Sequence, residues 1–364
     1  MELVSSLNTF VFIGSYSDPS ETGLYSCQFD SVTGQLSIID QVTGLLNPTF
    51  LDIDQEQLRL YALSEEKNSL NEPVGAAAAY KIDPTTGKLI FLNKARTVDS
   101  PTCHITLDQS RRYIMVSSYH GGVIGLSSIM EDGQIGPIIE AHTRTGSSIH
   151  QAQTQSRLHS ATLDQTNHFA IVADLGADII IVYKFDASEG KLMEHSEVKV
   201  EPGAGPRHFV FHPFLSIGFL INELNATIIS FCFDALNGIL IPVETVSTLP
   251  IGFKGDNGCA DIHISPDGCF LYGSNRGHDS IVVFAIDSID GKLTYVEHVS
   301  TMGRHPRNFA ISPDGQFLLV ANKDTNQIVT FARDANTGKL HSTGFELKLS
   351  KPVCIKFFTI SAKK

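Results

Sequence analysis

The chain has 364 residues, of which 42% are hydrophobic, so it is long enough and apolar enough to bury a sizeable core. Its formal charge of −12 argues against binding to nucleic acid or to an anionic membrane surface, because both require a basic field. Six scattered cysteines without a CxxC spacing indicate reduced thiols and exclude the usual patterns of a disulfide framework or a zinc site.

The first residues, MELVSSLNTFVFIG, carry an acid at Glu2 and no basic segment before an apolar core, so no signal peptide is expected. No apolar run approaches the roughly 18 residues that a membrane span requires. We therefore expect a cytoplasmic protein with no membrane partner.

Residues 9–17 (TFVFIGSYS) form the first strand-like run, and a turn of the form Gly-x-Leu or Gly-x-Ile then recurs at intervals of 46 to 57 residues. The seven turns begin at Gly34, Gly87, Gly133, Gly190, Gly238, Gly291 and Gly338. About four short strands per roughly 50-residue unit are typical of propeller blades. No segment shows a sustained 3.6-residue apolar period, which disfavours an α/β fold.

The two ends of the chain fit the same repeat. Residues 9–17 align with the second strand of a blade, and residues 351–358 (KPVCIKFF) align with a first strand. We therefore predict an all-β, seven-bladed β-propeller whose ring is closed by pairing the N-terminal strands with the C-terminal strand, which removes two sheet edges. Residues 1–364 are expected to form one domain.

The segment 205–224, GPRHFVFHPFLSIGFLINEL, predicts a hairpin that turns near Leu215. Folding an antiparallel pair about that point returns Glu223 to the level of Arg207. The opposite ends of these hairpins carry ordinary turn residues such as SPDG. When the other hairpins are aligned on this one, the same rim of the ring also receives His104, His159, Asn222, Arg276 and Arg307.

Four runs, AGPRHFVFHP, LINEL, DIHISPDGCFLYGSNRGHDSIVVF and HPRNFAISPDGQFLLVANKDTNQIVTF, resemble the seven-bladed propeller lactonases. This family includes bacterial 6-phosphogluconolactonases and the fungal carboxy-cis,cis-muconate cyclase, and the resemblance covers essentially the whole chain. It implies an active site at the channel mouth formed by His159, Arg207, Glu223 and Arg276. Relatives often carry a second His in an HxHS pattern, where this chain has Arg157. Further candidates for substrate binding are His104, Asn222, His278 and Arg307.

Lactone hydrolysis needs a base that activates water and positive charge where the oxyanion develops. Either His159 or Glu223 can serve as the base, and Arg207 or Arg276 can hold the oxyanion or a substrate phosphate or carboxylate. The sequence contains no HExxH, P-loop or dinucleotide GxGxxG motif. We expect no cofactor and no metal, because an arginine-rich rim would repel a divalent cation.

The main hypothesis is therefore a lactone hydrolase acting on 6-phosphoglucono-1,5-lactone, a small anionic sugar lactone, as a monomer or homodimer. One alternative keeps the pocket but uses it for cycloisomerisation of a carboxylated muconate. Another is a non-catalytic propeller that binds a partner on its rim, since propellers serve many functions. At the level of single residues, Arg207 and Glu223 could simply form an ion pair between strands, and His263 is expected to be structural.

Overall fold

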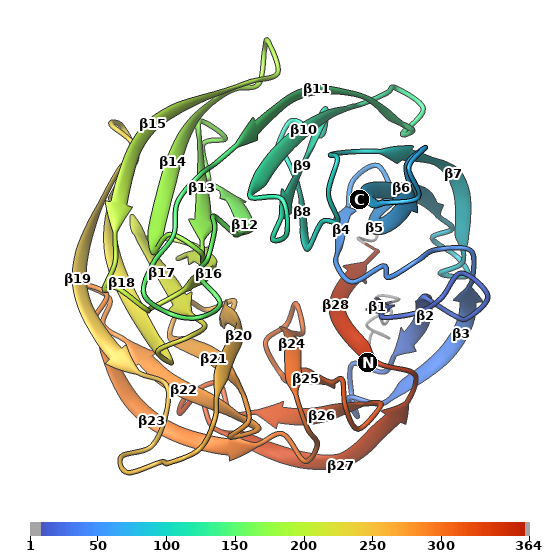
Figure 1. Ribbon diagram of the computed structural model, residues 1–364. Coiled ribbons are helices and arrows are strands. Elements are labelled where there is room, and N and C mark those ends of the chain that lie inside the picture. Colours follow the sequence, from blue (N-terminus) through green and yellow to red (C-terminus); the bar gives the residue numbers. More distant parts are fainter. Residues whose placement is uncertain (1–8, 361–364) are drawn as a thin grey trace.

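The computed structural model of the protein describes residues 9–360, which form seven antiparallel sheets of four strands each and contain no helix. The sheets stand like blades around a common axis (Figure 1). The predicted all-β, seven-bladed propeller is confirmed. The predicted single domain of residues 1–364 includes both chain ends, which lie outside the described residues.

The strands occupy the same four positions in each blade. The innermost strands are β4 (Leu51–Asp54), β8 (His104–Leu107), β12 (Leu158–Leu163), β16 (Pro206–Phe211), β20 (Gly258–Ile264), β24 (Pro306–Ile311) and β28 (Pro352–Thr359). The second strands are β5 (Arg59–Lys67), β9 (Tyr113–Ser118), β13 (Phe169–Asp174), β17 (Ile217–Asn222), β21 (Phe270–Arg276), β25 (Phe317–Asn322) and β1 (Thr9–Ser15). The third strands are β6 (Pro73–Ile82), β10 (Val123–Ile129), β14 (Ile179–Asp186), β18 (Thr227–Asp234), β22 (Ser280–Ile286), β26 (Gln327–Arg333) and β2 (Leu24–Phe29). The outermost strands are β7 (Leu89–Arg96), β11 (Ile135–Thr143), β15 (Lys191–Lys199), β19 (Ile239–Ser247), β23 (Leu293–Ser300), β27 (Leu340–Lys348) and β3 (Leu36–Val42).

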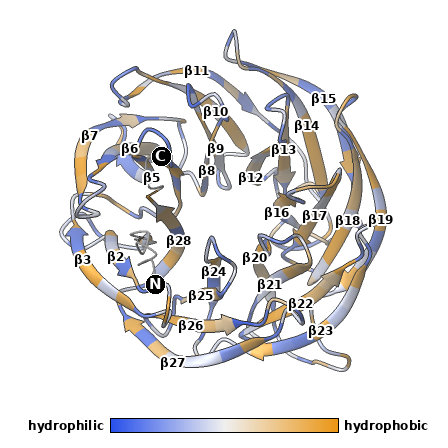
Figure 2. Ribbon diagram, turned by 180° about the vertical axis from the view of Figure 1, so that it is seen from behind, coloured by the Kyte–Doolittle hydropathy of each residue, from blue (hydrophilic) through white to orange (hydrophobic). Residues whose placement is uncertain are grey.

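Burial falls from the inner strands of each blade to its outer edge. Every residue of β9, β13, β17 and β25 is buried, because neighbouring blades cover both faces of these strands. The outermost strands alternate between exposed and partly buried residues, as in β15. Figure 2 shows this difference as apolar inner strands and as alternating apolar and hydrophilic bands along β15 and β19.

The recurring glycine turns join the third strand of each blade to the outermost strand. All seven glycines have positive φ values between 65° and 92°, a region that glycine enters without the steric cost of a side chain. Space is also limited: a Cβ added at Gly238 would lie 2.1 Å from Cε1 of Phe169 in the adjacent blade. Glycine therefore recurs at this turn because the backbone conformation and the limited space require it in every blade.

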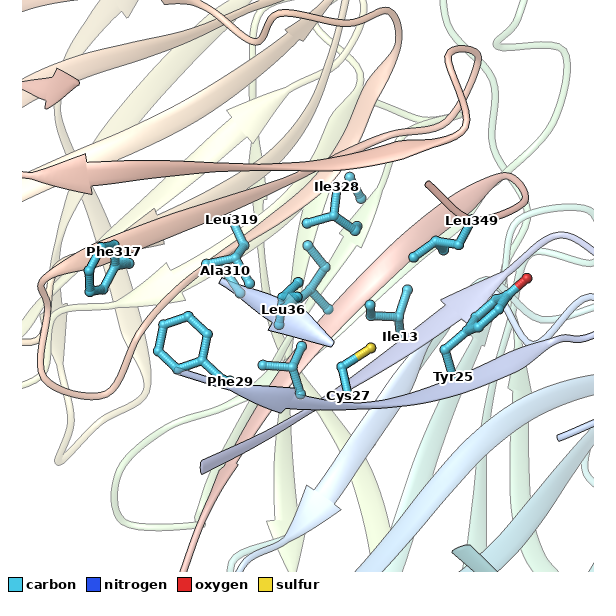
Figure 3. Close-up of a cluster of buried hydrophobic side chains, with 13 residues drawn as sticks. Ile13, Tyr25, Cys27, Phe29, Leu36, Ala310, Phe317, Leu319, Ile328 and Leu349 are labelled. Carbon is cyan, nitrogen blue, oxygen red and sulfur yellow. The ribbon is translucent and has the colours of Figure 1, made fainter. Parts of the chain in front are cut away.

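The hydrophobic core lies between adjacent blades, in one cluster per interface. Figure 3 shows the cluster between the sheet β28-β1-β2-β3 and the sheet β24-β25-β26-β27, which includes Ile13, Cys27 and Leu319. At its outer part the rings of Phe29 and Phe317 meet edge to face, with centroids 5.8 Å apart. Such packing fixes the angle between blades and hence the positions of the innermost strands.

The ring closes as predicted, by antiparallel pairing of β1 with β28. In this pairing Phe10 lies opposite Phe358, and in Figure 1 the two strands are the inner pair of one blade, with β28 next to the central opening. Phe358 is fully buried and its ring centroid lies 6.5 Å from that of Phe10 and 6.2 Å from that of Phe12. Side-chain packing thus stabilises the pairing of β1 with β28 that closes the ring.

Replacing Phe358 by Ala should lower the free energy of unfolding by about 3–5 kcal/mol, because the change leaves a cavity at the closure. Urea unfolding followed by circular dichroism measures this loss. Phe214→Ala is the matched control: that ring is 69% exposed, and the effect should stay within about 0.5 kcal/mol. Equal effects of the two substitutions would contradict the closure described here.

Candidate active site at one end of the propeller axis

The candidate catalytic residues project from irregularities in the innermost strands. In β12 the pairing with β13 passes from Leu158 to Ser160 and leaves His159 unpaired. The same irregularity in β16 leaves Arg207 unpaired, and in β24 it leaves Arg307 unpaired. A β-bulge of this kind redirects a side chain relative to the regular pleat. It turns these three residues toward the axis at one end of the propeller.

Glu223 joins two arginines from neighbouring blades. Its Oε2 atom lies 2.8 Å from Nε of Arg207 and 2.9 Å from Nη2 of Arg276. Gly205, with φ of 70°, accepts a hydrogen bond of 2.7 Å from the backbone nitrogen of Glu223, which fixes the end of the hairpin. The predicted approach of Arg207 and Glu223 is confirmed, and the carboxylate also reaches the next blade.

Arg207 lies beneath the surface of the site, since it is only 2% exposed. Its Nη1 atom donates to the carbonyl oxygen of Ala260, and its Nε atom donates to the carboxylate of Glu223. Burial, followed by the charge of Arg276, lowers the pKa of Arg207 to about 10, so it remains a cation at neutral pH. Arg207 therefore contacts the Glu223 carboxylate from the interior of the protein.

The electrostatic balance keeps Glu223 ionised. Burial alone would raise the pKa of its carboxyl group, but Arg276, Arg207 and Arg307 together hold the pKa below its usual value. The neighbouring cations therefore favour the ionised form of this carboxyl group. Its main physical effect is to bind and orient guanidinium groups.

His159 is the neutral group of the site. It is 4% exposed, and burial followed by the charge of Arg207 lowers its pKa well below the usual value. Its Nδ1 atom is buried and has no hydrogen-bond partner among residues 9–360. Buried polar atoms are usually paired, so an orphan nitrogen at a cavity wall suits a group that meets a ligand.

These side chains surround a cavity of about 260 Å³. Its lining includes Tyr16, Glu65, Tyr119, His159, Glu223, Arg276 and Arg307. The Nε and Nη2 atoms of Arg276 donate to the carbonyl oxygens of Gly258 and Cys259, whereas Nη1 has no partner in the described part of the chain. Arg276 can therefore donate to a bound molecule without breaking its existing contacts.

Two buried residues, His208 and Asp261, lie next to Arg207 in the interior of the protein. The carboxylate of Asp261 lies 2.8 Å from Nδ1 of His208 and 2.9 Å from Nε2 of His263. An ionised carboxylate only accepts hydrogen bonds, so the proton of His208 is on Nδ1 and its Nε2 atom is an acceptor. That Nε2 atom lies 3.3 Å from Nη1 of Arg207. The pair thus helps to orient Arg207.

Three predicted substrate-binding residues do not line this cavity. His104 is the first residue of β8 and lines a second cavity. Asn222 donates to Oγ1 of Thr227, 2.9 Å away. His278 lies 2.7 Å from Oγ of Ser280 and packs against other aromatic rings. Membership of the same rim therefore did not determine which side chains line the cavity, because each of these three makes other contacts.

Sequence reasoning did not single out three side chains of the cavity wall, Tyr16, Glu65 and Tyr119. Tyr16 and Tyr119 directly follow second strands, and Glu65 lies near the end of β5. All three align with Glu223 of its blade, so the alignment carried the signal. Arg157, which stands where relatives often have His, places its guanidinium carbon 4.6 Å from the centroid of the Tyr119 ring. This cation–π contact stabilises the position of Tyr119 in the cavity wall.

The second cavity, of about 200 Å³, lies farther along the innermost strands and is lined by His104, His208, His263, Asp52 and Lys356 among others. His263, which was expected to be structural, contacts Asp261 and the ring of Phe309, and its side chain is 37% exposed. Among residues 9–360 no group of three or more His, Cys, Asp or Glu side chains is placed to hold a metal ion. None of the described residues forms a helix that is long and apolar enough to cross a membrane.

The fold and site define a seven-bladed propeller with a polar, arginine-rich pocket at one end of its axis. The sequence matches the family described as Lactonase, 7-bladed beta-propeller, over residues 10–357. A 6-phosphogluconolactonase of Bacillus subtilis is 32% identical over 299 residues, covering 82% of this chain and 83% of the relative. One of Formosa agariphila is 37% identical over 310 residues, covering 82% and 85%.

Among solved structures, the periplasmic gluconolactonase PpgL of Pseudomonas aeruginosa superimposes with a TM-score of 0.90. It is 30% identical in sequence, and the match covers 96% of this chain and 99% of that one. The chain belongs to the seven-bladed β-propeller lactonase family, and it is a lactone-hydrolysing enzyme of that family.

The stability of the protein should fall as the pH drops from about 6.5 toward 5. Burial lowers the pKa values of His104, His159 and His208, the last to about 4, so each stays neutral in the folded chain and takes up a proton on unfolding. The unfolded chain thus binds more protons in this range, and each such histidine adds a slope of up to about 1.4 kcal/mol per pH unit.

Urea unfolding at a series of pH values measures this dependence. His104→Gln should make the slope shallower, whereas His341→Gln, at an exposed site, should leave it unchanged. Parallel profiles for the wild type and His104→Gln would show that His104 does not contribute to the loss.

Proposed function

We propose that this lactonase hydrolyses 6-phosphoglucono-1,5-lactone to 6-phosphogluconate. The observation that carries the proposal is the buried, neutral His159, with an orphan Nδ1 atom, on the wall of a cavity that also presents Arg276 and Arg307. A base that activates water and fixed positive charge at the oxyanion are the two requirements of lactone hydrolysis. The names of the Bacillus and Formosa relatives support the phosphorylated substrate.

His159 is the proposed base, and Arg276 the proposed oxyanion donor. A water molecule attacks the lactone carbonyl carbon while the imidazole takes up one of its protons. The carbonyl oxygen gains negative charge, which the partnerless Nη1 atom of Arg276 stabilises. When the bond from the carbonyl carbon to the ring oxygen breaks, the imidazolium returns the proton to that oxygen. No covalent enzyme intermediate is required.

Glu223 and Arg207 are the proposed positioning residues. Glu223 is the weaker candidate for the base, because its Oε2 atom already binds two guanidinium groups. An incoming phosphate dianion would also offset the positive field at His159. The imidazole would then become a stronger base when substrate is bound.

The convergence of His159, Glu223, Arg276 and Arg307 on one enclosed cavity supports an enzyme over a partner-binding scaffold. We propose in addition that the protein acts in the cytoplasm on a small anionic lactone, as a monomer or homodimer and without a nucleic-acid partner. The free state of all six cysteines and the formal charge of −12 support this setting.

Purified protein added to freshly generated 6-phosphoglucono-1,5-lactone should release acid faster than the spontaneous reaction. His159→Gln should lower kcat by about 10²–10⁴-fold through loss of the base. Arg276→Gln should lower it by about 10²–10³-fold through loss of the oxyanion donor. A pH-indicator assay follows the release.

His341→Gln and Arg96→Gln, both at exposed sites, are the matched controls and should retain wild-type rates. A carboxylated muconate, tested in parallel by its ultraviolet absorbance, should not react. The proposal fails if the wild-type protein gives no acceleration, or if both site variants keep full activity.

A further inference from the structure

Arg307 and Lys323 occupy the same places in their blade as Arg207 and Glu223 do two blades earlier. Both arginines are the unpaired residues of a bulge in the innermost strand. The backbone nitrogen of Glu223 donates to the carbonyl oxygen of Gly205 at 2.7 Å, and that of Lys323 donates to the carbonyl oxygen of His305 at 3.1 Å. The two pairs of side chains therefore stand in equivalent backbone positions.

The charge of the second member is reversed between these two blades. Glu223 neutralises the bulge arginine of its blade, whereas Lys323 adds a second cation beside Arg307. Within residues 9–360 no carboxylate forms an ion pair with Arg307. Lys323 pairs with Asp324 at 3.1 Å, but that carboxylate is 45% exposed and follows it directly in the chain. Arg307 thus lines the cavity and Lys323 lies behind it, and among the described residues Asp324 is the only carboxylate that forms an ion pair with either cation.

Tyr16 fixes the position of both cations. The guanidinium carbon of Arg307 lies 5.7 Å from the centroid of its ring, and Nζ of Lys323 lies 5.9 Å from the same centroid. Tyr16 and Arg307 line the cavity, and His159 lines it as well. The repulsion between the two cations is best relieved by an anion placed between them.

The positive charges in this region also lower the pKa of a neighbouring histidine. Burial, then the charges of Arg276 and Lys323, lower the pKa of His305 to about 4. His305 therefore stays neutral and adds no charge of its own at neutral pH. The local excess of positive charge rests on the arginines and on Lys323.

We propose that Arg307 and Lys323 form the subsite that binds the phosphate group of the substrate. This inference rests on the proposed function. Arg307 offers a planar fork for two phosphate oxygens and Lys323 a compact point charge. With the phosphate held there, the lactone carbonyl lies toward His159 and Arg276, and Tyr16 packs beside the carbon chain that joins the two ends.

Lys323→Glu tests the subsite, because the chain already holds an Arg and a Glu in the equivalent positions 207 and 223. The change also removes the ion pair with Asp324, so circular dichroism first checks that the variant is folded. The variant is compared with wild type on 6-phosphoglucono-1,5-lactone and on glucono-1,5-lactone, which lacks the phosphate. KM for the phosphorylated lactone should rise by about 10- to 100-fold, as expected for loss of a charge-assisted contact. The kcat/KM for the unphosphorylated lactone should stay within about twofold of wild type.

Lys339→Glu, the same change at an exposed turn of the same blade, is the control and should leave both lactones unaffected. Equal losses for the two lactones, or no change for either, would overturn the phosphate subsite while leaving the lactonase activity intact.

A binding experiment separates the subsite from the proposed function. Calorimetry with 6-phosphogluconate and with gluconate needs no turnover. If the wild-type protein hydrolyses neither lactone, the proposed function fails. The subsite then stands only if the wild type binds 6-phosphogluconate at least about tenfold more tightly than gluconate and Lys323→Glu abolishes that preference.

Discussion

The double ion pair of Glu223 is the contact on which the site depends. One oxygen of its carboxylate binds Arg207 from the same blade and Arg276 from the next, so the pair ties two blades together at the axis. Buried charges are costly unless they are paired and hydrogen-bonded. Here the carbonyl oxygens of Gly258, Cys259 and Ala260 accept further hydrogen bonds from the two arginines, and Nη1 of Arg276 remains available to a ligand. The network is therefore stable as a unit and holds its members in fixed directions.

The propeller supplies what this network requires. Seven innermost strands meet around the axis, and bulges in three of them redirect His159, Arg207 and Arg307 to one end. The next residue of one of these strands, His208, turns away from that end and joins Asp261 below the site. One strand thus contributes both a member of the site and its support. Closely packed blade interfaces keep the seven contributions in register.

The fold and the Arg207–Glu223 contact could be predicted because both depend on short-range rules. A glycine turn repeats in every blade, and an antiparallel hairpin returns residue 223 to the level of residue 207. Side-chain direction could not be read in the same way, because a bulge leaves no signal in residue spacing. His104 and His278 lie near the predicted rim but point elsewhere, while the burial of Arg207 and its support by His208 depend on contacts between blades.

The central claim is that a phosphorylated lactone is hydrolysed in this one cavity in a single orientation. A crystal structure of the protein with bound 6-phosphogluconate tests it most directly. We expect the carboxylate of this product beside His159 and within hydrogen-bond distance of Nη1 of Arg276, with its phosphate between Arg307 and Lys323. A product molecule bound in the opposite orientation, or in the second cavity beside Lys356, would contradict it.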